Sequence, residues 1–233
     1  YLPEERGLYK KMEVGEQAVY LAQLKGMSRP EAIKRLKYWF EKFEITNWWR
    51  KKIEELSKGM QQKVQFIVTV VHEPQLLILD EPFTGFDPIN ANLIKDELLQ
   101  MKAKGVSIVL STHRMESVEE LCTHIALIHK SKKLLEGPVR EVRKSYRNNL
   151  YEFEVEQTDG STLLSELGGI PVVSNVVSGD YARVTVHLNS AADANLLLQK
   201  IAAKATLHSF REVLPSMNDI FIQTVSQTSA GHE

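Results

Sequence analysis

Apolar and polar positions alternate at helical spacing through the first third of the chain. In one stretch the apolar side chains recur every three or four positions: Ile33, Leu36, Phe40 and Phe43. This spacing predicts a helix over residues 28–45, with Ser28 and Glu31 placed as a capping box at its start. Similar patterns predict helices over residues 13–27 and 58–71. Helices therefore dominate this part of the sequence.

The pattern then changes to short apolar runs. "QLLILD" (75–80) and "VSIVLS" (106–111) have the length and composition of strands covered on both faces. Between them, Asp87 is a helix N-cap with Pro88 at the first helical position. A short helix and two pairing strands are expected next, over residues 114–122, 124–129 and 132–137. Apolar strands alternating with helices predict a parallel α/β sheet.

Strict two-residue alternation marks the last third of the chain. "YEFEVE" (151–156) places Tyr151, Phe153 and Val155 on one face and glutamates on the other, and "YARVTVHL" (181–188) alternates in the same way. The intervening "SGD" is a hairpin turn. A helix, a strand and a capped helix follow, over residues 191–203, 207–214 and from Ser216. We expect a small α+β domain here, of ferredoxin-like fold.

These patterns predict an α/β protein built from unequal parts. The first is a partial α/β domain over residues 1–147, with a helical portion (1–73) and a sheet portion (74–147). The second is the α+β domain over residues 148–226. Residues 227–233 are expected to form a frayed tail.

Composition and charge narrow the classes of function. The chain has 233 residues, 43% hydrophobic and 25% charged, and its formal net charge of −1 provides no basic field for nucleic acid. The single cysteine, Cys122, excludes an internal disulfide, and the scattered histidines show no zinc-ligand spacing. No apolar run approaches the roughly 18 residues of a membrane-spanning helix.

Two adjacent acids, Asp80 and Glu81, end the first predicted strand, and "STH" (111–113) ends the second. In open parallel sheets, ligands gather at these carboxyl ends. One carboxylate would hold Mg²⁺ and the other would deprotonate an attacking water, with His113 near a terminal phosphate. Taken alone, Asp-Glu-Pro is equally well explained as a turn or a helix cap.

A second motif, "LSKGM" (56–60), precedes these strands and opens a predicted helix. Backbone N–H groups at such a helix start favour a phosphate, although a lone Ser57 is more often only an N-cap. The ordered set of "LSKGM", "LLILDEP", "TGFDP" and "STH" is poorly explained by chance.

Over residues 1–140 this set resembles the ATP-binding subunit of ATP-binding cassette (ABC) transporters. The resemblance implies a Walker B strand, with Asp80 toward Mg²⁺ and Glu81 as catalytic base, and His113 as the switch histidine. It implies a signature motif that contacts the γ-phosphate of ATP in the opposite subunit: Ser57, Lys58, Gly59 and Met60. Asp87, in the D-loop, would reach across the dimer, and Glu4 would stand in the Q-loop.

Three residues depart from the family pattern. Glu4 stands where most members carry glutamine, and Lys58 and Met60 replace a glycine and a glutamine of the commoner L-S-G-G-Q. With the appended α+β domain, these features resemble the sodium-extrusion and ABC-2-type exporters. Lys58 could add a cation near the phosphates or be a solvated lysine, and Met60 lacks the hydrogen bonding of a glutamine amide.

The phosphate-binding loop G-x-x-x-x-G-K-[ST] does not occur in the sequence, and neither does any Gly-Lys dipeptide. This loop supplies the backbone cradle and the lysine for the β- and γ-phosphates. We therefore interpret the chain as a C-terminal fragment that lacks the Walker A region, and we expect the isolated chain not to bind ATP well.

The resemblance implies an ATPase subunit of a membrane exporter, with ATP and Mg²⁺ as cofactors. Expected partners are a transmembrane permease subunit and a second copy of the ATPase subunit, but no nucleic acid, with the protein cytoplasmic and peripheral on the inner membrane face. One alternative is a soluble ABC-type ATPase acting on ribosomes or DNA. Another is that the C-terminal domain is a dimerisation or regulatory module.

Overall fold

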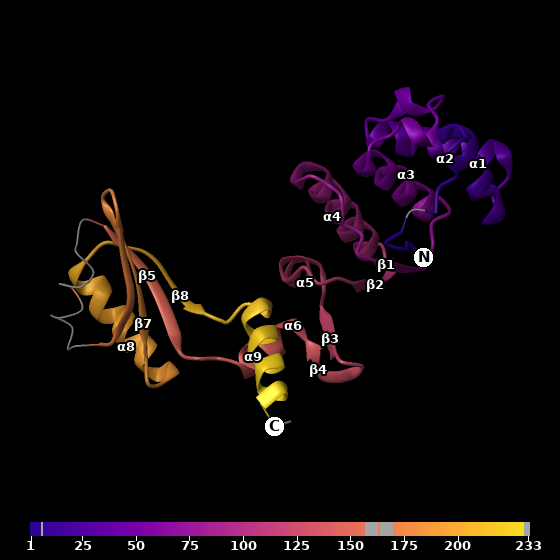
Figure 1. Ribbon diagram of the computed structural model, residues 1–233. Helices are drawn as coiled ribbons and strands as arrows, with labels where there is room; N and C mark the ends of the chain where they lie inside the picture. The colour runs from indigo at the N-terminus through magenta and orange to yellow at the C-terminus, as the bar shows by residue number, and fades with distance from the viewer. Residues whose placement is uncertain (6, 157–162, 164–169, 231–233) are drawn as a thin grey trace. The chain divides into compact units, whose positions relative to one another are not determined.

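The computed structural model describes residues 1–5, 7–156, 163 and 170–230. The chain divides into two compact units, Tyr1–Leu121 (unit 1) and Cys122–Glu233 (unit 2) (Figure 1). No helix within the described residues is long and apolar enough to cross a membrane. Unit 1 contains α1 (Val14–Leu24), α2 (Arg29–Lys42), α3 (Lys58–Val70), β1 (Leu76–Asp80), α4 (Pro88–Ala103), β2 (Ser107–Ser111) and α5 (Met115–Leu121), with short 3₁₀ turns at Thr46–Trp48 and Ile53–Glu55.

The predicted helices of unit 1 are confirmed, with ends shifted by a few residues. Ser28 caps α2 by accepting a hydrogen bond from the Glu31 N–H at 3.4 Å. The reciprocal half of the predicted capping box is replaced by an ion pair, because the Glu31 carboxylate contacts Arg35 at 2.8 Å. Buried apolar side chains from α1, α2 and α3 form one core with those of β1 and α4.

Gly15, at the start of α1, must be a glycine because it lies against the indole ring of Trp49. The Gly15 N–H donates to the Trp49 carbonyl at 2.9 Å, and a Cβ atom at Gly15 would lie 2.3 Å from Trp49 Cε2. Trp49 itself packs edge-on against Phe40, with ring centroids 5.2 Å apart. The indole therefore fills the space that any other side chain at Gly15 would need.

Gly15→Ala is expected to lower the free energy of unfolding by about 1–3 kcal/mol, because the new methyl group displaces the Trp49 ring from a packed core. Denaturant titration followed by circular dichroism measures this. Gly7→Ala is the control, since a Cβ there meets nothing within 4 Å. Equal unfolding free energies for the wild type and Gly15→Ala would contradict the packing argument.

The parallel sheet of unit 1 pairs β1 with β2 in register from Leu76↔Ser107 to Asp80↔Ser111. The N-terminal residues extend it by a parallel bridge between Leu2 and Leu79. The prediction that these strands are covered on both faces is wrong for the described chain. Leu77 and Leu79 are buried, whereas the alternate side chains on the other face are exposed: Leu76, Ile78 and Val109.

Unit 2 contains a hairpin, a four-stranded antiparallel sheet and helices. Its elements are β3 (His124–His129), β4 (Lys132–Pro138), α6 (Val139–Ser145), β5 (Leu150–Glu156), β6 (Val172–Ser178), β7 (Tyr181–His187), α8 (Ala191–Lys204), β8 (Leu207–Val213) and α9 (Met217–Ala230). The strand order β6-β7-β5-β8 is the ferredoxin-like arrangement. Alternate residues of β5 and β7 are buried, as the two-residue pattern predicts.

Two predicted boundaries in the C-terminal part differ from the structure. The compact units divide at Leu121/Cys122 rather than at residues 147/148. A cut at 147/148 would sever contacts of α6, because Arg143 Nε donates to the Pro215 carbonyl at 2.9 Å and the Tyr146 hydroxyl contacts Thr224 Oγ1 at 2.9 Å. Residues 227–230, expected to be part of a tail, continue α9, while residues 231–233 lie outside the described chain.

Candidate functional site

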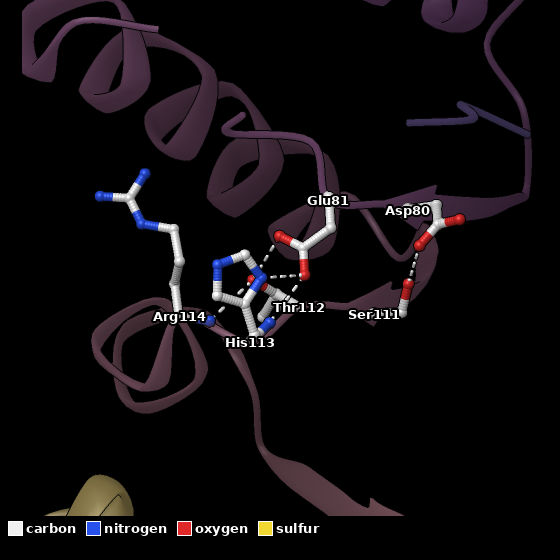
Figure 2. A network of polar contacts seen from close by, with 6 residues as sticks. All are labelled: Asp80, Glu81, Ser111, Thr112, His113 and Arg114. Atoms are coloured by element: carbon white, nitrogen blue, oxygen red, sulfur yellow. Dashed lines mark hydrogen bonds and ion pairs between the residues drawn. The ribbon is translucent and has the colours of Figure 1, made fainter. Parts of the chain in front are cut away.

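The carboxyl ends of β1 and β2 bring the predicted acids beside the "STH" segment (Figure 2). Asp80 is the last residue of β1 and lies directly opposite Ser111 in the register. Its carboxylate accepts a hydrogen bond from Ser111 Oγ, and its second oxygen lies 3.5 Å from the Tyr1 hydroxyl. Asp80 therefore presents a carboxylate at the strand end, flanked by hydroxyl groups.

Glu81 turns out of the strand by a left-handed backbone conformation, with φ of 44°. Such a value is costly for a residue with a side chain and is typical of functional sites. The Glu81 carboxylate is then held by donors from the next strand end. Its Oε1 lies 2.7 Å from both the backbone nitrogen and Nδ1 of His113, and its Oε2 accepts from Thr112 Oγ1 at 3.1 Å.

Figure 2 shows that the two adjacent carboxylates take different partners. Glu81 and His113 form one contact pair, while Asp80 pairs with Ser111 instead. Alternation along a strand sends adjacent side chains to opposite faces, but alternation is not the whole cause here. The positive φ of Glu81 redirects its side chain toward residues 112–113.

The "LSKGM" motif opens α3, with Ser57 as its N-cap accepting from the Met60 N–H at 3.3 Å. Lys58 is exposed, and Met60 is half-buried against the core of unit 1. Gly59 closely approaches the turn after β1, because a Cβ atom there would lie 3.1 Å from the Gly85 carbonyl. The helix start therefore contacts the "TGFDP" turn.

Asp87, at the end of that turn, is the N-cap of α4, as predicted. Its carboxylate accepts from the Asn90 N–H at 3.0 Å. This backbone hydrogen bond, followed by one from the Asn90 side chain, holds the pKa of Asp87 below its usual value. Nothing within the described residues ties Asp87 to the Glu81–His113 pair.

Glu4 is exposed in the N-terminal segment. The backbone on either side of it is hydrogen-bonded by Gln65, a residue that the sequence analysis did not identify. Gln65, on α3, donates from Nε2 to the Pro3 carbonyl at 3.2 Å and to the Glu5 carbonyl at 3.4 Å. No local signal distinguishes Gln65, because the same face of α3 also carries the polar residues Gln61, Gln62 and Thr69. Thr112, a second contributor without an assigned role, lies within the "STH" segment.

Asp80 is the residue with the right chemistry for a magnesium ion. Carboxylate oxygens suit this hard cation, which is usually bound through one or two carboxylates together with waters and substrate phosphates. Among the described residues no group of three or more His, Cys, Asp or Glu side chains could enclose a metal by itself. The donor set therefore fits a metal shared with a phosphate ligand, and not a closed protein cage.

Comparisons with known proteins identify the family to which the chain is similar. The "ABC transporter" family model matches residues 1–84, and the model "ATP-binding protein DrrA1-3-like, C-terminal domain" matches residues 137–225. The chain is 41% identical over 99% of its length to an ABC transporter ATP-binding protein of Alkalihalophilus pseudofirmus, covering 84% of it. It is 43% identical to the ABC transporter ATP-binding protein YhaQ of Bacillus subtilis, covering 97% of this chain and 74% of that protein.

A solved structure, "Structure of ATP binding subunit of ABC transporter", is similar with a TM-score of 0.59 at 31% identity. The match covers 63% of this chain and 61% of that one. The chain therefore belongs to the family of ABC transporter ATP-binding proteins.

Proposed function

We propose that this chain supplies the hydrolytic residues of an ATP-driven exporter subunit. Two such subunits would close head to tail around Mg-ATP and drive a separate transmembrane permease from the inner face of the membrane. The observation that carries the proposal is the Glu81 carboxylate, fixed at a strand end by His113 and Thr112. The family relationship supports the same chemistry.

Glu81 would act as the general base that orients and deprotonates the attacking water. A base must be positioned before its basicity matters, and the contacts from residues 112–113 supply that positioning. His113 would link the base to the nucleotide. In its protonated form the imidazole donates from both nitrogens, so Nδ1 could bind Glu81 while Nε2 binds a phosphate oxygen.

Asp80 would hold Mg²⁺, which neutralises charge on the phosphates when bound. The signature residues would contact the γ-phosphate held by the second subunit: Ser57, Lys58, Gly59 and Met60. The backbone N–H groups of Lys58 and Gly59 at the start of α3 would bind it, while the Met60 N–H donates to Ser57 Oγ. Asp87 would reach across the same dimer. Glu4 would lie in the segment that senses the permease.

The proposal is tested by ATP hydrolysis in a protein that carries this chain behind a phosphate-binding loop. Hydrolysis is expected to require Mg²⁺ and to stop when EDTA removes it. Asp80→Asn keeps an acceptor for Ser111 but removes the charge, and should lower turnover at least about a hundredfold. Asp96→Asn, on the exposed side of α4, is the control. Turnover that is unchanged by Asp80→Asn would overturn the metal assignment.

A further inference from the structure

Ser111, the last residue of β2, makes two contacts with the acids at the end of β1. Its hydroxyl donates to Asp80 Oδ1, as Figure 2 shows. Its backbone carbonyl accepts from the Glu81 N–H at 3.0 Å. Because the carbonyl already joins the two strand ends, the hydroxyl is not needed for that purpose.

The register of the sheet places the Ser111 hydroxyl beside the Asp80 carboxylate. Ile78 pairs with Val109, and Asp80 pairs with Ser111. Because side chains alternate along a strand, Asp80 and Ser111 share a face with the exposed Ile78 and Val109. The two polar side chains therefore lie together on the exposed face of β1 and β2.

The chemistry of the two groups fixes the direction of their hydrogen bond. An ionised carboxylate only accepts hydrogen bonds, so the Ser111 hydroxyl is the donor and Asp80 Oδ1 the acceptor. The other oxygen, Oδ2, has the Tyr1 hydroxyl at 3.5 Å, which is at the long limit for a hydrogen bond. Oδ1 is therefore the oxygen that the protein holds, and Oδ2 is the one that can bind a ligand.

We propose that Ser111 is a positioning residue for Mg²⁺: its hydroxyl holds Asp80 Oδ1, so that Oδ2 stays available to the ion. The inference rests on the proposed function, in which Asp80 holds Mg²⁺. Carboxylates that bind metals are usually oriented by hydrogen bonds from outer groups, and loss of such a group typically weakens metal binding about 10- to 100-fold. The Ser111 contact is exposed, so we expect the lower end of this range.

The neighbouring hydroxyl has the other acid as its partner. Thr112 Oγ1 donates to Glu81 Oε2 at 3.1 Å and accepts from the Arg114 N–H at 3.1 Å. Adjacent hydroxyls at the end of β2 therefore serve different carboxylates. Loss of the Ser111 hydroxyl should affect metal binding, whereas loss of the Thr112 hydroxyl should affect the hydrolytic step.

The dependence of ATP binding on Mg²⁺ tests the proposal without hydrolysis. The protein carries this chain behind a phosphate-binding loop, and Glu81→Gln in every sample prevents turnover of the ATP. Titrations in Mg²⁺ and in EDTA give two dissociation constants, whose ratio is the gain in affinity that the metal provides. Ser111→Ala should lower this gain about tenfold and leave the value in EDTA unchanged. A purely structural defect would instead weaken binding in both conditions.

Three further variants serve as controls for Ser111→Ala. Ser111→Thr keeps a hydroxyl and should keep the gain, and Ser107→Ala, on the same face at the other end of β2, should keep it too. Asp80→Asn should abolish it. If Ser111→Ala kept the gain that Asp80→Asn loses, the positioning role would be overturned and the proposed function would stand. If Asp80→Asn also kept the gain, the metal assignment of the proposed function would fail, and this inference with it.

Turnover of ATP separates the two hydroxyls in the same protein with Glu81 intact. Ser111→Ala should raise the Mg²⁺ concentration for half-maximal hydrolysis about tenfold, with a much smaller effect at saturating Mg²⁺. Thr112→Ala should lower turnover about tenfold at saturating Mg²⁺ and leave that concentration unchanged. Identical Mg²⁺ dependences for the two variants would overturn the assignment of Ser111 to the metal.

Discussion

Replacing Glu81 with glutamine is expected to lower ATP turnover about 10²- to 10⁴-fold, the range that a positioned general base contributes. The protein for this experiment carries the chain behind a phosphate-binding loop. Glutamine is nearly the same size and keeps a carbonyl oxygen that can accept from the His113 N–H, now 2.7 Å from Glu81 Oε1. It cannot take a proton from water. Binding of ATP should therefore persist while hydrolysis is lost.

The measurement pairs a phosphate-release assay with a nucleotide-binding titration, so that loss of chemistry is separated from loss of binding. Glu116→Gln, at an exposed position of α5 near the same strand end, is the matched control and should turn over ATP at the wild-type rate. Turnover of Glu81→Gln within a fewfold of the wild type would reject Glu81 as the base. The position of the carboxylate would then have to be explained as a structural contact.

Replacing Lys42 with methionine is expected to destabilise unit 1 by about 3 kcal/mol, because it leaves a buried carboxylate without its partner. Lys42 Nζ lies 2.5 Å from Glu97 Oε1, and the two side chains are only 27% and 5% exposed. The pair joins α2 to α4, and Lys42 also lies over the Trp39 ring at 5.5 Å. Denaturant titration measures the change in unfolding free energy.

Two further variants serve as controls for the Lys42→Met experiment. Lys42→Met combined with Glu97→Leu should recover most of the lost stability, because no unpaired charge stays buried. Lys144→Met breaks the solvent-exposed Lys144–Glu141 pair and should cost less than about 1 kcal/mol. If Lys42→Met lowered the free energy of unfolding no more than Lys144→Met does, the burial of Glu97 would not determine how much the Lys42–Glu97 pair contributes to stability.

The Lys42–Glu97 pair also predicts a pH dependence. Burial lowers the pKa of Lys42, but the hydrogen bond and the charge of Glu97 outweigh it, so the pKa lies above its usual value of 10.5. A lysine whose pKa is raised by folding stabilises the fold below the unfolded pKa and loses that contribution as the pH rises through the folded pKa. The difference between wild type and Lys42→Met should therefore shrink above about pH 10.5.

Local patterns were sufficient for most elements of this chain. Periodicity located α2 and the alternating strand β5, and N-cap residues located the starts of α3 and α4. Element ends were less predictable, because α9 continues through residues 227–230, whose sequence suggested fraying. The open face of β1 was also missed. An apolar run alone does not say which of its faces the rest of the chain covers.

For the site as well, the sequence predicted the residues that belong to local motifs and missed the features that depend on contacts between distant segments. The motifs named Glu81 and His113, and strand order placed them at one sheet edge. The sequence could not reveal the left-handed backbone at Glu81 or the contact from Thr112, because both depend on how two strand ends meet. Gln65 was missed for a similar reason, since its partners are backbone carbonyls some sixty positions away.

The hydrogen bonds from Gln65 couple the N-terminal segment to α3. Its amide holds the carbonyls on either side of Glu4, and it belongs to the same rigid helix, α3, whose first turn starts at Ser57. A displacement of residues 3–5 must either break these two hydrogen bonds or move α3 as well. Because Gln65 lies midway along α3, we expect a displacement of residues 3–5 to be transmitted to the helix and to the "LSKGM" segment at its start.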